Sequence, residues 1–155
     1  MGKIPLYNDP ILHEFCEAML KSSKRAIGLI ETHGINYKNV RAYGRGATFM
    51  HTAALCGDLQ MMQYLIDKGA DVNAADYFGT TPLHESIIHC HEPKKCRDAV
   101  ELLLKNGATI STLPLQMAEA LSKHEVVSLI EQTKVNRTLS DINNQNKPKI
   151  TSTTF

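Results

Sequence analysis

The chain has 155 residues, 43% of them hydrophobic and 21% charged, which is the composition of one folded domain and not of a disordered chain. Its 17 Lys and Arg are balanced by 16 Asp and Glu, so the basic excess typical of a nucleic-acid-binding domain is missing. No apolar run approaches the roughly 18 residues of a membrane span, and the first residues lack a signal-peptide pattern. We therefore expect a cytoplasmic protein, with the nucleus as an open alternative, and no membrane partner.

The first segment, about 10–40, carries a weak copy of a pattern that recurs later. In "ILHEFCEAMLKSSKRAIGLIETHGIN", His13 and Gly34 occupy the places of a His and a Gly that the later copies share. The polar stretch at 21–25 fits a solvated turn between two helices. We predict a degenerate N-terminal unit here.

Two complete units follow, at about 43–75 and 76–110. Pairs of identical residues recur 33 positions apart: Gly46 with Gly79, Thr48 with Thr81, and His51 with His84. Recurrence at this period is the signature of stacked structural repeats. The sequence therefore predicts a solenoid built from similar units.

Each unit contains the signals of two short helices. Thr81 is suited to cap a helix whose first turn tolerates Pro82. Apolar residues at helical spacing follow, and Gly69 and Gly107 come where a left-handed residue ends the second helix of each unit. Between the units, "ADVNAADYFGTT" carries turn residues and predicts a short extended hairpin, or finger.

A last unit is predicted at about 111–133, in "LPLQMAEALSKHEVVSLIE", where Pro114 falls 32 residues after Pro82. The remaining residues, 134–155, are rich in Asn, Thr, Ser and Lys and show no sustained apolar period. We predict that they form a disordered tail.

Two spacings depart from the regular unit. His51 and Gly69 are 18 residues apart, whereas His84 and Gly107 are 23 apart, so five residues, approximately "HEPKK", are inserted at the turn between the two helices. Gly69 to Pro82 spans 13 residues, whereas Gly107 to Pro114 spans only 7. We therefore expect a longer helix–helix turn in one unit and a finger that is mostly missing before the last unit.

These motifs resemble the ankyrin-repeat family: "GTTPLH", "GADVNAADYFGTTPLH" and "KNGA" recur at the family's interval. The resemblance covers about 12–131. It implies an all-α repeat solenoid, a stack of helix-turn-helix units with short β-hairpin fingers, over a domain of about 1–133. It also implies that His51 and His84 are structural, each bonding the backbone of an adjacent finger.

The resemblance further implies a concave surface of fingers and first helices that binds other proteins. By register, the partner-binding positions are Arg45, Ala47, Leu55 and Cys56 in one unit and Ala75, Tyr77, Phe78, Thr80, Ile88 and His89 in the next. Tyr77 and Phe78 stand out, because aromatic residues are enriched at binding hot spots. The alternative for Phe78 is that it folds back onto the neighbouring finger.

We interpret the chain as a non-catalytic protein-protein interaction module, monomeric when free and without a cofactor. The expected role is to mask a surface of one partner, as do small ankyrin inhibitors of Rel-type transcription factors and of cell-cycle kinases. A bridging adaptor or scaffold is the alternative. No phosphate loop, nucleophile elbow or His-Glu-x-x-His motif indicates an enzyme.

Two other hypotheses remain. The stretch "HCHEPKKC" places His89, Cys90, His91 and Cys96 close in sequence, which suggests a metal-stabilised module, although zinc needs four converging ligands. Nucleic-acid binding through Lys94, Lys95, Arg97 and the basic tail is the second. The four cysteines, Cys16 included, fit a reducing compartment better than a disulfide framework.

Overall fold

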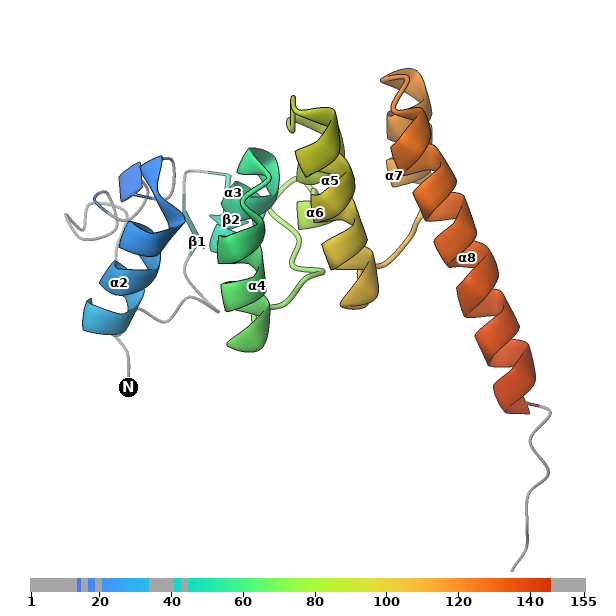
Figure 1. The fold of residues 1–155 in the computed structure, drawn as a ribbon, viewed down its shortest axis with the longest axis horizontal. Coiled ribbons are helices and arrows are strands. Elements are labelled where there is room, and N and C mark those ends of the chain that lie inside the picture. Colours follow the sequence, from blue (N-terminus) through green and yellow to red (C-terminus); the bar gives the residue numbers. More distant parts are fainter. Residues whose placement is uncertain (1–13, 15–16, 19–20, 34–40, 43–44, 146–155) are drawn as a thin grey trace, which may run out of the picture.

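The computed structural model describes residues 14, 17–18, 21–33, 41–42 and 45–145 (Figure 1). The predicted anchors His13 and Gly34, and Cys16, lie outside the described residues. The described elements, with the labels of Figure 1, are α2 (Ser23–His33), β1 (Arg41–Ala42), β2 (Ala47–Thr48), α3 (Phe49–Cys56), α4 (Leu59–Asp67), α5 (Pro82–Ile88), α6 (Pro93–Lys105), α7 (Thr112–Ala120) and α8 (His124–Gln145).

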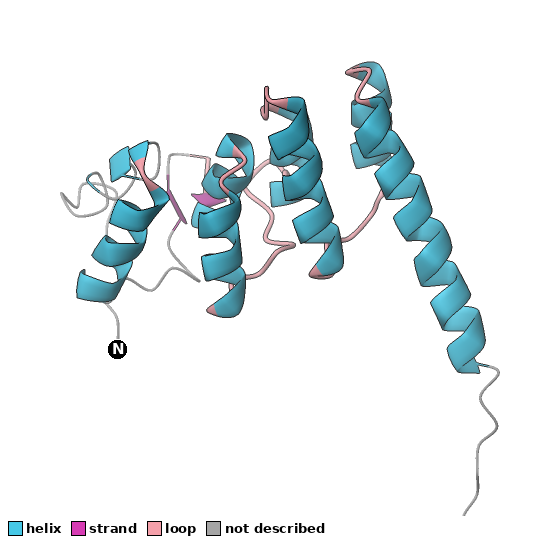
Figure 2. Cartoon of the chain, in the orientation of Figure 1, coloured by secondary structure: helices cyan, strands magenta, loops and turns pink. Residues whose placement is uncertain are grey.

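The helices form two layers of a repeat stack (Figures 1 and 2). Helices α3, α5 and α7 contact one another in series and form the layer of first helices. Helices α2, α4, α6 and α8 form the layer of second helices in the same way. The predicted all-α solenoid of helix-turn-helix units is therefore confirmed.

The core lies between the two layers and runs through all the described units. Helical spacing of apolar residues puts one stripe of each helix inside, and burying each large side chain contributes about 1.5–3 kcal/mol. The largest apolar side chains that are fully buried are Phe49, Met50, Met61, Met62, Leu65, Leu83, Ile87, Leu103 and Ile130. Apart from α8, the described helices have only 7 to 13 residues and are too short to be stable alone, so the packing between units holds the stack together.

The fingers differ from one junction to the next. The first is a two-stranded hairpin in which Arg41 pairs with Thr48 and Ala42 with Ala47. The second has no strand and is closed by the Asp76 N–H, which donates to the Thr80 carbonyl at 2.9 Å. The third is absent: Figure 1 shows a short direct link from α6 to α7, which the sequence spacing predicted.

The five inserted residues do not all enlarge the turn, so that prediction was only partly right. Four residues, 89–92, connect α5 to α6, whereas two, Gly57 and Asp58, connect α3 to α4. The rest of "HEPKK", Pro93 to Lys95, forms the first turn of α6, because proline is well suited to the first position of a helix.

The prediction of a disordered tail from residue 134 is wrong for residues 134–145, because α8 continues to Gln145. Arg137 holds this extension: its guanidinium donates to the carbonyls of Leu104 and Ala108, at 2.7 and 2.9 Å, at the C-terminal end of α6. The hydroxyls of Thr138 and Ser140 donate to carbonyls four residues earlier. Residues 146–155 lie outside the described part of the chain.

Ser122 has the strained backbone of the turn between α7 and α8. Its φ is 53°, close to the 63° of Gly57 at the corresponding turn after α3. A side chain in this left-handed conformation costs about 1 kcal/mol, and glycine avoids that cost.

We therefore expect Ser122→Gly to raise the free energy of unfolding by about 0.5–1 kcal/mol. Urea denaturation followed by circular dichroism measures the change. Ser122→Ala is the matched control: it keeps the Cβ and should give no gain. Equal stabilisation by both variants would show that backbone strain is not the cause.

Candidate functional site: the surface of fingers and first helices

His51 joins the first complete unit to the finger that follows it. The Thr48 N–H donates to His51 Nδ1 at 3.1 Å, and His51 Nε2 lies 2.8 Å from the Thr80 carbonyl oxygen. Since Nδ1 accepts a hydrogen bond, the neutral ring carries its hydrogen on Nε2 and donates it to Thr80. This geometry supports the structural role predicted for His51.

Arg45, in the first finger, makes ion pairs with two buried acids, Asp76 and Glu85, of the next unit along the chain. Its guanidinium makes an ion pair with Glu85 and lies 3.3 Å, through Nε, from Oδ2 of Asp76. The side chains of Glu85 and Asp76 are 1% and 0% exposed, whereas that of Arg45 is 36% exposed. His89 lies 3.7 Å from the other oxygen of Glu85, so Arg45 and His89 are brought together around one carboxylate.

The titration of Asp76 and His84 makes the fold sensitive to acid. Burial on its own would raise the pKa of Asp76, but the N–H groups of Thr80 and Phe78, together with Arg45, hold it below the ordinary 3.8. Burial lowers the pKa of His84 below 6.5, and the Asp76 carboxylate opposes this only in part. For both groups the unfolded chain binds the proton more readily than the folded chain does.

We therefore expect the free energy of unfolding to be highest above pH 6.5 and to fall in two stages as the pH is lowered. The contribution of His84 is lost as the pH falls below 6.5, and that of Asp76 as it falls below 3.8. Urea titrations between pH 8 and pH 3 measure both stages. In His84→Asn the first stage should be smaller, and an unchanged first stage would assign it to another group.

A row of aliphatic side chains runs across the ends of the first helices. Leu55 and Ile88, 33 residues apart, lie at the ends of α3 and α5, and Leu121 directly follows α7. Leu55 and Leu121 are 36% and 47% exposed. We call these three residues the aliphatic row.

Two hollows lie beside the aliphatic row. One, of about 410 Å³, is lined by Leu55, Cys56, His89, Cys90, His91, Glu92 and Lys95. The other, of about 380 Å³, includes Leu121 and shares Cys90 and His91 with the first. Adjoining hollows that combine exposed leucines with His, Glu and Lys side chains are suited to side chains projecting from another protein.

The two aromatic residues of the second finger have different surroundings. The ring of Tyr77 lies on Gly46 of the preceding finger, since a Cβ at Gly46 would stand 2.7 Å from ring carbons. The Tyr77 N–H also donates to the Arg45 carbonyl at 3.0 Å. Tyr77 is 70% exposed and Phe78 is 80% exposed, so the Tyr77 ring covers Gly46 with one face while most of both rings stays open to solvent.

The remaining predicted positions are distributed unevenly. Cys56 and His89 line one hollow with Leu55, as the register predicted for a shared surface. Ala75 is exposed, and Thr80 is half-buried with its carbonyl engaged by His51. Ala47 is 3% exposed in β2, so the prediction that its side chain meets a partner is wrong.

Sequence reasoning missed two residues of this surface. By the 32-residue offset of Pro114 from Pro82, Leu121 corresponds to His89, so extending the register into the last unit could have found it. Glu85 had no such signal, because a glutamate in a helix is ordinarily solvated and only the fold places it under Arg45.

The cysteine-rich stretch is engaged in local contacts. Cys96 Sγ donates to the Ser86 carbonyl at 3.0 Å, and Cys90 Sγ to the Glu92 carbonyl at 3.7 Å. Among the residues that the structure describes, no three His, Cys, Asp or Glu side chains converge as metal ligands would. Burial raises the pKa of the Cys56 and Cys90 thiols, which favours the protonated and weakly nucleophilic form.

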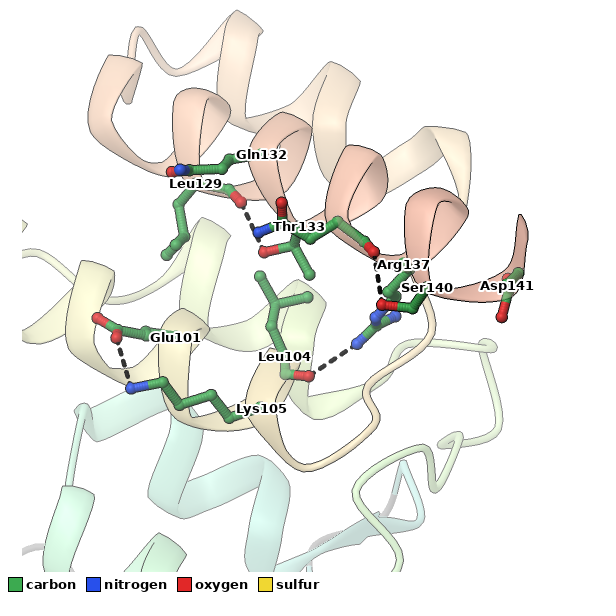
Figure 3. Close-up of a pocket in the computed structure, with 10 residues that line it drawn as sticks. Glu101, Leu104, Lys105, Leu129, Gln132, Thr133, Arg137, Ser140 and Asp141 are labelled. Atoms are coloured by element: carbon green, nitrogen blue, oxygen red, sulfur yellow. Dashed lines mark hydrogen bonds and ion pairs between the residues drawn. The ribbon is translucent and has the colours of Figure 1, made fainter. Parts of the chain in front are cut away.

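A larger hollow, of about 600 Å³, lies between α6 and α8 (Figure 3). Its charged and polar side chains are paired with one another or with the backbone: Lys105 with Glu101, Thr133 with the Leu129 carbonyl, and Arg137 with the Leu104 carbonyl. Of these contacts, the one made by Arg137 joins α8 to α6, and the other two lie within one helix each. The hollow is therefore part of the packing of the last unit.

Within the described part of the chain, no helix is both long and apolar enough to cross a membrane.

Comparison with known proteins agrees with this architecture. The family model of ankyrin repeats (three copies) matches residues 12–113. The chain is 32% identical over 117 residues to protein phosphatase 1 regulatory subunit 12A of Mus musculus, which covers 74% of this chain and 11% of that protein. It is 36% identical over 83 residues to potassium channel AKT1 of Arabidopsis thaliana, covering 54% and 10% respectively. The chain thus spans about a tenth of the length of these curated relatives.

Among solved structures, an ankyrin repeat domain from Acinetobacter baumannii AYE superimposes with a TM-score of 0.65 at 26% sequence identity. The match covers 77% of this chain and 63% of that one.

Proposed function

Because the chain belongs to the ankyrin-repeat family, we propose that it binds one partner protein stoichiometrically through the aliphatic row and its two hollows, and so masks a surface of that partner. Ankyrin repeats are protein–protein interaction modules, and the fold is typically non-catalytic. The proposal assigns the binding to a defined part of the surface.

The observation that carries the proposal is the aliphatic row itself. Leu55 and Leu121 are 36% and 47% exposed, one at the end of α3 and the other directly after α7, instead of being buried in the core. Apolar side chains aligned beside hollows and rimmed by charged groups are typical of a binding surface. Phe78, at 80% exposure, extends the apolar character to the second finger.

The relatives support binding over catalysis. The mammalian relative is named a regulatory subunit, and this chain corresponds to about a tenth of it. A masking role on a transcription factor or a kinase, in the cytoplasm or also in the nucleus, is the specific form of the proposal. A short row of three residues offers contact area for one partner and not for two, so we favour the masking role over the bridging role.

The test is affinity capture from extract with the full chain and with a Leu55→Ser/Leu121→Ser variant. Because hot-spot contacts carry most of an interface's energy, retention of the partner should fall at least about tenfold. The matched control is Leu139→Ser in α8, which is 53% exposed and lies away from the row. Circular dichroism establishes that all three chains are folded.

A protein retained equally by the native chain and by the double variant would contradict the proposal. For the native chain, the mass of the purified complex distinguishes masking from bridging. Masking predicts one partner for each chain, whereas a bridging adaptor would carry two different partners at once.

A further inference from the structure

The junction between the third and fourth units lacks a finger, whereas the junction before it shows how a finger is held. Three contacts hold the second finger against the preceding unit, residues 43–75. The Tyr77 N–H donates to the Arg45 carbonyl, the Tyr77 ring lies on Gly46, and the Thr80 carbonyl accepts from His51 Nε2.

One repeat later, each of these three places lacks its occupant. The Phe78 carbonyl, which corresponds to that of Arg45, accepts no backbone hydrogen bond from the described residues. A Cβ built on Gly79, which corresponds to Gly46 and has nearly the same φ (78° against 75°), meets nothing within 4 Å. His84 Nε2, which corresponds to that of His51, is buried without a hydrogen-bond partner.

The His84 ring has the same orientation as that of His51, because the same contacts hold it. The Thr81 N–H donates to His84 Nδ1 at 3.0 Å and the Thr81 hydroxyl lies 2.8 Å from the same nitrogen, as Thr48 does for His51. With Nδ1 accepting, the hydrogen of the neutral ring is on Nε2. His84 is 8% exposed, so this is a buried donor, and burial without an acceptor costs free energy.

The link from α6 to α7 does not replace the missing finger. The Asn73 side chain donates to the Gly107 carbonyl and accepts from the Thr109 N–H, at 3.1 and 2.8 Å. These bonds hold the link at the root of the second finger. The space over Gly79 stays open, and the Phe78 side chain beside it is 80% exposed.

We propose that this finger gap, defined by Phe78, Gly79 and His84, is a docking site for an extended segment of the partner protein that supplies the missing finger contacts. The segment presents a Tyr or Phe whose ring lies over Gly79 and whose N–H donates to the Phe78 carbonyl. Its carbonyl three residues later accepts the hydrogen bond from His84 Nε2, as the Thr80 carbonyl does from His51. The inference rests on the proposed function and names the chemistry of the partner.

The probe that tests the site is a peptide with the sequence of residues 71–81, DVNAADYFGTT, which is the finger that fills the corresponding place one repeat earlier. Nuclear magnetic resonance of the ¹⁵N-labelled full chain should show saturable shifts of the Gly79 amide and of His84 Nε2–H. A peptide with Ala in place of Tyr should bind about tenfold more weakly, because it lacks the ring. Equal shifts with both peptides, or no saturable shift at these groups, would overturn the proposal.

Two glycine variants form a matched pair for the same titration. Gly79→Asn places a side chain where the ring would lie and should abolish peptide binding. Gly107→Asn carries the same kind of backbone strain, with φ of 87° and nothing within 4 Å of its Cβ, and should bind as the native chain does. If Gly79→Asn binds the peptide as well as Gly107→Asn does, the gap is not the site.

A second measurement does not depend on peptide affinity. Six residues inserted into the α6–α7 link, to give the spacing of the preceding finger, should raise the midpoint of thermal unfolding if the gap is vacant. A lower midpoint would show that the short link already fills it.

Finally, if Gly79→Asn retains the captured partner while Leu55→Ser/Leu121→Ser loses it, the proposed function stands and the finger-gap inference fails.

Discussion

Replacing Arg45 with Met is expected to lower the free energy of unfolding by about 2–3 kcal/mol, near the lower end of the cost of breaking a buried ion pair, because Arg45 is itself partly exposed. The variant leaves the carboxylate of Glu85 buried without its cation. Asp76 is less affected, since its Oδ1 still accepts the N–H groups of Phe78 and Thr80. Urea denaturation at pH 7 measures the loss.

The control for Arg45 also removes the carboxylate of Glu85. Arg45→Met/Glu85→Leu replaces this ion pair with apolar groups and should recover part of the lost stability, because Glu85 is no longer buried without its cation. The Asp76 carboxylate stays buried in both variants, held by the N–H groups of Phe78 and Thr80. A loss below about 0.5 kcal/mol in Arg45→Met alone would contradict the account, since that is the range of an ordinary surface substitution.

Replacing Gly46 with Ala should be the most damaging of the glycine substitutions. The new Cβ would stand 2.7 Å from carbons of the Tyr77 ring, so this ring, which is 70% exposed, must shift, and the φ of 75° adds backbone strain. Together these effects should lower the free energy of unfolding by about 2–4 kcal/mol.

Gly79→Ala separates the two causes, because the backbone at Gly79 has nearly the same φ of 78° and open space around it. It should cost only the backbone term of about 1–2 kcal/mol. If both variants are destabilised equally in thermal or urea unfolding, the packing of Tyr77 on Gly46 contributes nothing to the fold.

The repeated residues made most of the fold predictable. The helix start at Pro82, the contact of His51 with the next finger and the missing finger all follow from local signals or from comparing one unit with the next. The same contact predicted for His84 is wrong, because no finger follows that unit and His84 Nε2 has no hydrogen-bond partner. The continuation of α8 was not predictable in that way, because residues 134–145 are polar and depend on Arg137 reaching the carbonyls at the end of α6. That contact joins residues about thirty positions apart and leaves no mark on the local pattern.

The binding surface was predicted in part for a similar reason. Of the partner-binding positions predicted by register, Leu55, Cys56 and His89 line one hollow, and their role in binding stays a prediction. It cannot distinguish Tyr77 from Phe78, since neighbouring residues of a turn point in different directions and only the position of Gly46 shows which ring packs. It also cannot show that Ala47 is buried, because a small residue in a short strand has the same pattern at the surface and in the interior.

The measurement that tests the central claim most directly is photo-cross-linking from defined positions of the last unit. Benzoylphenylalanine placed at Leu121, in the aliphatic row, should give one discrete adduct of one chain with one partner protein. The same group at Leu139, which is comparably exposed on α8, should give none of that product. Equal cross-linking from both positions, or an adduct only from Leu139, would contradict binding through the surface of fingers and first helices.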